Sequence, residues 1–158
     1  MSSWADVMGA APELAAAVRG RFDAHVHTTM ATLRRDGSPR ISGTEVVFWD
    51  GELWLAGMPA SRKLADLRRD GRVAVHSGSD DPPAWTGDAE VTGRAVEVTE
   101  AAALAAFAAA LPAGAPGEFE LFRVALHEAV LVRLGEPGDH LVIEAWHEGR
   151  GLSRAIRR

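Results

Sequence analysis

The chain has 158 residues, of which 47% are hydrophobic and 25% are charged, and its formal net charge at pH 7 is −5. This length predicts a single domain with its own core, and the acidic balance argues against a nucleic-acid partner, which needs a basic surface. The absence of cysteine excludes disulfides, thiolate metal sites and cysteine nucleophiles, and it fits a cytoplasmic protein.

No membrane partner is expected, and no secretory signal precedes the first elements. The longest uncharged run, Ala101–Gly117, is broken by Pro112, so its helical part spans roughly 16 Å, about half of a bilayer core. The domain is expected to divide into an N-terminal helical segment (1–26), a barrel (27–147) and a basic tail (148–158) without regular structure.

The first half of the chain predicts a helix followed by three antiparallel strands. Apolar residues at every fourth position predict the helix over Pro12–Ala24, after a short turn that contains Trp4. Asp36-Gly37 and Asp50-Gly51 are typical of tight hairpin turns. The three strands are expected at His27–Arg35, Pro39–Trp49 and Glu52–Ala56.

The remaining elements continue this β-rich pattern. A short helix from Ser61 ends at Asp70-Gly71, and an Ala-rich helix covers Glu100–Ala110 with Thr99 as its cap. Gly93 is placed where a long strand would bend, and Pro112–Gly117 is expected to be a flexible connection. Four further strands are expected at Arg72–His76, Asp88–Thr99, Val124–Leu134 and His140–Trp146. This order predicts a mainly β fold, an antiparallel split β-barrel of six to seven strands.

The start of the short helix has an electrostatic misfit. Arg62 and Lys63 follow the N-cap Ser61, although the partial positive charge of a helix N-terminus favours acidic residues there. An anionic ligand would explain the pair, because amides, dipole and cations could converge on one phosphate. The alternative is a solvated pair that Asp66 neutralises at spacings of four and three.

The segment MATLRRDGSPRISGTEVVFWDGELWLAGMPASRKLADLRRDGRVAVH, residues 30–76, resembles the pyridoxamine 5'-phosphate oxidase-like flavin-binding split barrels. The most specific part is the pair of hairpins followed by SRK. The resemblance implies a homodimer that binds FMN or the deazaflavin coenzyme F-420 in a cleft between subunits.

The resemblance also implies roles for particular residues. Arg62 and Lys63, with Ser61, would hold the cofactor phosphate, and Ser42 and Thr44 would lie along the ring system. The remaining candidates are Met58 and Pro59 beside the ribityl chain, His76 at the ring edge and Trp146 stacked near the cofactor. Ordinary strand polarity is the alternative for Ser42 and Thr44, and a packed core position is the alternative for Trp146.

The C-terminal segment departs from the vitamin oxidase of this family. That enzyme carries an Arg-Leu-His-Asp-Arg motif for its substrate, whereas residues 146–154 read WHEGRGLSR. Oxidation of pyridoxine phosphate is therefore not expected. No metal site is expected either, because the six histidines are scattered and no helical His-x-x-x-His pair occurs.

The leading hypothesis is an oxidoreductase in which a flavin or deazaflavin passes a hydride to or from a small organic substrate. The absence of sequence triads agrees with chemistry carried by a cofactor. A second hypothesis is a protein that sequesters flavin or a tetrapyrrole without turnover. A third is a barrel that has lost its ligand and acts as an interaction dimer.

Overall fold

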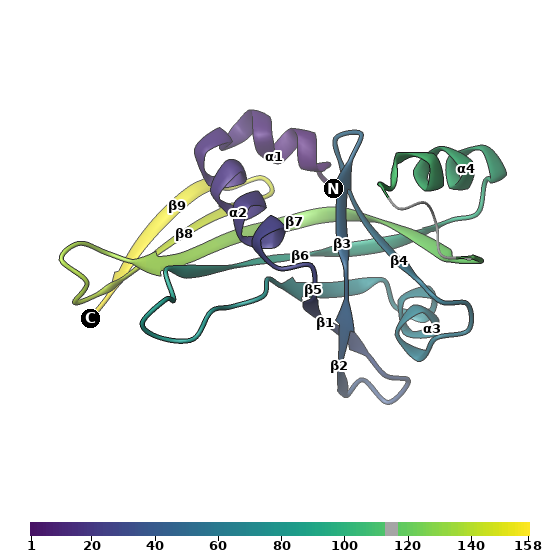
Figure 1. Ribbon diagram of the computed structural model, residues 1–158, viewed down its shortest axis with the longest axis horizontal. Coiled ribbons are helices and arrows are strands. Elements are labelled where there is room, and N and C mark those ends of the chain that lie inside the picture. The colour runs from purple at the N-terminus through teal and green to yellow at the C-terminus, as the bar shows by residue number, and fades with distance from the viewer. Residues whose placement is uncertain (113–116) are drawn as a thin grey trace.

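The computed structural model describes residues 1–112 and 117–158. Within these residues the chain forms four helices and nine strands. Figure 1 shows that they make an elongated molecule. The elements are α1 (Trp4–Ala10), α2 (Pro12–Ala24), β1 (Thr28–Leu33), β2 (Pro39–Thr44), β3 (Val46–Trp49), β4 (Glu52–Gly57), α3 (Arg62–Arg69), β5 (Arg72–His76), β6 (Gly87–Val98), α4 (Ala101–Ala110), β7 (Glu120–Leu134), β8 (Leu141–His147) and β9 (Gly151–Arg157).

All nine strands belong to one antiparallel sheet that does not close. Its main path runs β2-β1-β5-β6-β7-β4-β3, and β8 and β9 branch from β7. β7 is the strand at which the sheet divides. Its first residues, Glu120 to Val124, pair with β4, whereas Glu128 to Leu134 pair with β8. The fold is therefore mainly β and a split β-barrel, as the sequence predicts.

The strand count differs from the expected six to seven for two reasons. The predicted strand Pro39–Trp49 breaks at Glu45 into β2 and β3, each of which has its own partner strand. The basic tail was also expected to lack regular structure, and this prediction is wrong. Gly149 in the turn and Gly151 at the start of β9 both have φ of 73°, which lets β9 fold back onto β8.

Three other boundaries differ from the predictions. The turn around Trp4 is a helix, because Ser3 and Asp6 form a capping box. β7 begins at Glu120, four residues before the predicted start. Glu100 rather than Thr99 occupies the N-cap of α4. The predicted connection Pro112–Gly117 lies mostly outside the described residues.

Gly93 lies at a β-bulge, at the position where the sequence predicts a bend. The register between β6 and β7 shifts between Thr92 and Gly93, so that His127 is the extra residue of a bulge. A Cβ atom at Gly93 would lie 2.3 Å from the carbonyl oxygen of Ala125, so only glycine allows this approach of the two strands.

Two apolar clusters lie on opposite faces of the sheet. The main cluster joins α1, α2 and α3 to the inward residues of most strands, including Val18, Met30 and Trp146. The smaller cluster lies under α4, where Phe107 contacts Trp54 and Trp49 at centroid distances of 5.8 and 6.1 Å. None of the described helices has the length and apolar character needed to cross a membrane.

Candidate functional site

The turn before α3 is constrained and ends in an unpartnered hydroxyl. Ala60 has a positive φ of 61°, a strained value for a residue with a side chain, and its amide donates to Glu120 Oε1 at 3.3 Å. Ser61 occupies the N-cap with an extended backbone, but its side chain makes no capping hydrogen bond. Ser61 Oγ is buried without a hydrogen-bond partner in the described chain, so the turn holds an unused polar atom at the helix start.

The two cations at the helix start differ in their surroundings. The exposed Arg62 makes no ion pair or hydrogen bond within the part of the chain that the structure describes. Lys63 is half-buried, and its Nζ donates to the carbonyl oxygen of Gly43 at 2.6 Å. Burial lowers the pKa of Lys63, and the charge of Glu45 opposes this shift. Lys63 therefore links α3 to β2, whereas Arg62 is available for a ligand.

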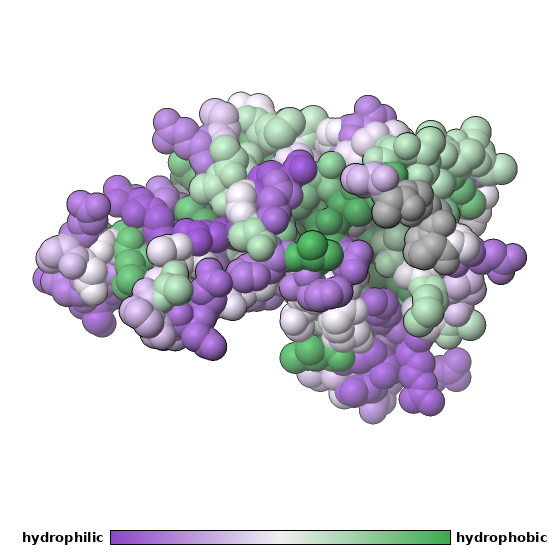
Figure 2. All heavy atoms as spheres, in the orientation of Figure 1, coloured by the Kyte–Doolittle hydropathy of each residue, from purple (hydrophilic) through white to green (hydrophobic). Residues whose placement is uncertain are grey.

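Arg62 lines a strongly basic recess of about 700 Å³ between the β1–β2 hairpin and α3. Figure 2 shows hydrophilic residues gathered at this corner of the molecule, at the lower right of the view. The charged residues of the recess are Arg34, Arg35, Asp36, Arg40, Arg62, Asp66 and Arg69. Five arginines against two aspartates give this recess a positive charge on a protein that is negative as a whole.

Asp66 does not neutralise Arg62 and Lys63, so that part of the alternative is wrong, although Arg62 is exposed to solvent as the alternative expects. Its buried carboxylate accepts hydrogen bonds from Arg40 Nε at 2.6 Å, Arg69 Nη2 at 3.0 Å and Thr32 Oγ1 at 3.0 Å. Arg69 also donates to the carbonyl oxygen of Leu33. Asp66 thus fixes two guanidinium groups in the wall of the recess and leaves the cations at the helix start unpaired with it.

The two polar candidates on β2 face the inner side of the sheet. Ser42 lies opposite the buried Met30, and Thr44 lies opposite Thr28. Thr44 is buried, and its carbonyl oxygen accepts from Thr28 Oγ1 at 3.0 Å. Because Lys63 bonds to Gly43, between these two residues, the structure brings β2 next to the start of α3.

The other four candidates divide into two groups. Met58 and Pro59 are exposed on the turn that leads into Ser61. His76 lies at the exposed end of β5, where its Nδ1 donates to the carbonyl oxygen of Ser77 at 2.7 Å. Trp146 is 5% exposed within the main cluster. Neither His76 nor Trp146 makes a hydrogen bond to the turn before α3 in residues 1–112 and 117–158.

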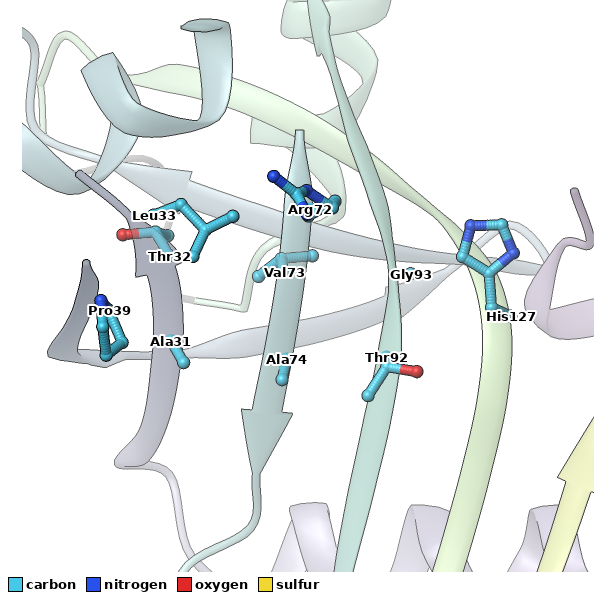
Figure 3. A pocket seen from close by; sticks show the side chains of 10 residues that line it. All are labelled: Ala31, Thr32, Leu33, Pro39, Arg72, Val73, Ala74, Thr92, Gly93 and His127. Carbon is cyan, nitrogen blue, oxygen red and sulfur yellow. The ribbon is translucent and has the colours of Figure 1, made fainter. Parts of the chain in front are cut away.

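A second recess, of about 340 Å³, lies on the open face of the sheet. Figure 3 shows that it is lined by side chains from β1, β5, β6 and β7, including Ala31, Ala74, Thr92 and His127. None of the nine predicted site residues lines it, and its surface is mainly apolar. This face therefore offers contact area rather than an anion site.

The residues at the start of α3 fit a phosphate group. Ser61 Oγ can donate to an anionic oxygen, the guanidinium group of Arg62 can add two charged N–H donors, and the helix N-terminus contributes its dipole. By contrast, no group of three His, Asp or Glu side chains in the described residues is arranged to hold a metal ion.

Sequence reasoning missed three residues that complete the site. Arg40 and Arg69 line the recess, and Glu120 holds the amide of Ala60. Arg40 is 26 positions from Asp66, and Glu120 is 60 positions from Ala60, so no local spacing could reveal these contacts. The Arg34-Arg35 pair was the available signal, because it placed positive charge beside the first hairpin turn.

The fold is a split β-barrel whose candidate site is suited to an anionic group. The family profile described as pyridoxamine 5'-phosphate oxidase matches residues 14–133. The chain belongs to this family. No protein with a curated description matches the chain.

Solved structures with the same fold have diverse descriptions. A pyridoxamine 5'-phosphate oxidase-related, FMN-binding protein from Nostoc punctiforme has a TM-score of 0.66 and 13% identity, and 96% of each chain is covered. PhzG from Burkholderia lata, in complex with tetrahydrophenazine-1-carboxylic acid, has a TM-score of 0.60 and 15% identity, with 93% of this chain and 89% of PhzG covered. HutZ, the heme storage protein of Vibrio cholerae, has a TM-score of 0.57 and 16% identity, with 75% of this chain and 91% of HutZ covered.

Proposed function

We propose that the protein is a flavin- or deazaflavin-dependent oxidoreductase that transfers a hydride to or from a small organic substrate. The observation that carries this proposal is the start of α3. There, the unpartnered Ser61 Oγ and the unpaired Arg62 adjoin a basic recess in a family that includes an FMN-binding relative. The bound cofactor would supply the hydride chemistry, so the protein needs to supply binding and position.

The chain's own residues have distinct tasks in this proposal. Ser61 and Arg62 bind the cofactor phosphate, and Lys63 adds charge while it ties α3 to β2. Ser42 and Thr44 present hydroxyl groups along the ring system. Met58 and Pro59 line the path between the ring and the phosphate. His76 and Trp146 stay candidates for the ring edge and for stacking.

The proposal includes a homodimer in which the second subunit completes the cofactor cleft. Trp49 and Trp54 do not supply an uncovered aromatic surface for this contact, because α4 packs against both through Phe107. The open sheet face provides a better reason, because Ile41 on edge strand β2 is 74% exposed and lies opposite the small Ala31. An exposed apolar edge of this kind favours association.

A second candidate function is storage of a tetrapyrrole without turnover. The similarity to the fold of HutZ favours it, because that protein is described as a heme storage protein. The anionic propionates of heme could use the same basic recess. This function would require no hydride transfer.

The test is a titration of the full-length protein with FMN, F-420 and heme, followed by turnover with the reduced form of the cofactor that binds. Saturable binding of a flavin or deazaflavin, together with oxidation of its reduced form by an added organic acceptor, is the expected result. Tight heme binding without flavin binding would favour storage. Binding of a flavin without turnover for any acceptor would leave only the sequestering role.

A further inference from the structure

An apolar slot of about 230 Å³ opens beside the turn that leads into α3. β3 and β4 form one wall through Val47 and Ala56, and α4 forms the other through the fully buried Phe107. Leu111 and Phe119 complete the apolar lining. The slot is therefore a separate site from the basic recess, which lies on the side of β2 and α3.

The size of the slot limits its occupant to one or two rings. An apolar cavity of about 150 Å³ accepts benzene, so about 230 Å³ accommodates a bicyclic aromatic or one ring with a side chain. The walls suit an aromatic compound, because Phe107 and Phe119 lie 5.8 Å apart with their rings tilted at 44°. Phe107 is fully buried and supports Phe119 from behind, so a ligand ring would contact the half-buried Phe119.

The rim of the slot is acidic. Glu45 and Glu118 both line it, and no basic residue does. Glu118 makes no ion pair with any described residue, and Glu45 faces His27 at 3.6 Å in a pair whose side chains are 62% and 90% exposed. Solvent screens such an exposed pair strongly. Burial lowers the pKa of Lys63 and the charge of Glu45 opposes this shift, but Lys63 Nζ donates to the carbonyl oxygen of Gly43 and makes no ion pair with Glu45 among the described residues.

We infer that this slot binds a small aromatic compound that carries a cationic amine, with its ring on Phe119 and its ammonium group at Glu45 and Glu118. Met58, at the rim, also belongs to the turn where the proposed function places the cofactor. As a substrate site, the slot rests on that proposed function. As a binding site for an aromatic amine, it stands on the geometry alone.

The binding test uses three probes of one shape and different charge: 2-naphthylmethylamine, 2-naphthylmethanol and 2-naphthoate. Each is titrated by calorimetry into the full-length protein, with and without FMN. Trp49 and Trp54 contact Phe107, so their fluorescence gives a second signal of occupancy. We expect the amine to bind at least about tenfold more tightly than the carboxylate.

Two variants separate the rim from the walls. The double variant Glu45→Gln with Glu118→Gln is expected to lose the preference for the amine. The control is Glu13→Gln with Glu136→Gln, which removes the same charge from exposed positions outside the slot. This control is expected to keep the preference. Ala56→Met is expected to fill the slot and to weaken the binding of all three probes. Circular dichroism checks that this variant folds.

The outcomes also separate this inference from the proposed function. Failure of the amine to bind, or equal binding of all three probes, overturns the inference even if FMN binds normally. An amine preference that survives the Glu45 and Glu118 changes overturns it as well. Probe binding in a protein that does not bind flavin or deazaflavin supports the slot and overturns the proposed cofactor role.

Discussion

Arg40 Nε donates to Asp66 Oδ2 at 2.6 Å, which joins β2 to α3 through a carboxylate that is almost fully buried. Thr32 and Arg69 donate to the same carboxylate. These hydrogen bonds offset the cost of removing the charge of Asp66 from water. It also places two arginines in the wall of the basic recess at fixed positions.

We predict that Asp66→Asn destabilises the protein by about 3 kcal/mol. Removing one partner of a buried ion pair costs about 3 to 5 kcal/mol, and the side chains of Arg40 and Arg69 are 19% and 34% exposed, which favours the lower end. Urea unfolding followed by circular dichroism measures the change. Asp23→Asn, in the exposed pair with Arg19, is the control and is expected to cost less than about 0.5 kcal/mol.

The contribution of Asp66 is also predicted to depend on pH. Burial, the largest single influence, acts to raise the pKa of Asp66, but hydrogen bonds from Arg40, Arg69 and Thr32 together outweigh it and keep the pKa below its usual value. A lowered pKa in the folded state gives stability above the unfolded value of about 3.9, and this stability is lost as the pH falls through the folded pKa. The stability difference between the parent and Asp66→Asn is therefore expected to shrink below about pH 4. A difference that stays constant down to pH 2.5 would contradict this assignment.

The sequence predicted those features that depend on neighbouring residues. The helix over Pro12–Ala24 and the turn at Asp50-Gly51 follow from local periodicity and turn chemistry, and the structure confirms both. β9 could not be predicted in this way, because its alternation is weak and its pairing partner, β8, determines it. The site shows the same limit: the cations of α3 were visible in sequence, but their relation to Asp66 depends on partners up to 34 positions away.

We predict that the protein is a dimer and that Ile41→Asp weakens it. The change places a carboxylate on the exposed apolar face of β2, where association would bury it without a partner, so we expect at least a tenfold increase in the dimer dissociation constant. Light scattering over a range of protein concentrations measures it. Leu152→Asp, at a 59% exposed position on β9, is the matched control. A monomer at every concentration would rule out both the dimer and the shared cofactor cleft.

We predict that the FMN-loaded protein does not oxidise pyridoxine 5'-phosphate efficiently. The C-terminal residues that would bind this substrate are replaced by WHEGRGLSR, which here forms the end of β8, a turn and the start of β9. Oxygen consumption with this substrate provides the measurement. Turnover within the normal range for enzymes, about 1 to 1,000 per second, would show that the changed segment does not prevent the reaction.

The last prediction concerns Arg62 and Lys63. If both hold the cofactor phosphate, each charge-assisted hydrogen bond contributes about 1.5 to 3 kcal/mol, so that replacing both by Ala weakens cofactor binding by about 3 to 6 kcal/mol. This corresponds to roughly a hundredfold to ten-thousandfold increase in the dissociation constant. Folding stability is expected to change little, because the loss of the bond from Lys63 to Gly43 is offset by the removal of two cations from the positive end of α3.

The control for this prediction has to lie away from the recess. Replacing Arg34 and Arg35 by Ala would remove the same charge. Both residues line the same recess as Arg62, however, so this change would also alter the candidate site. Arg154→Ala with Arg158→Ala is the better control, because β9 and the C-terminus lie at the opposite end of the molecule from α3 (Figure 1). FMN and F-420 are titrated into the parent and both double variants. Equal affinities across all three proteins would mean that the cations of α3 do not bind the cofactor, whereas a loss confined to Arg62→Ala with Lys63→Ala would assign the phosphate to the start of this helix.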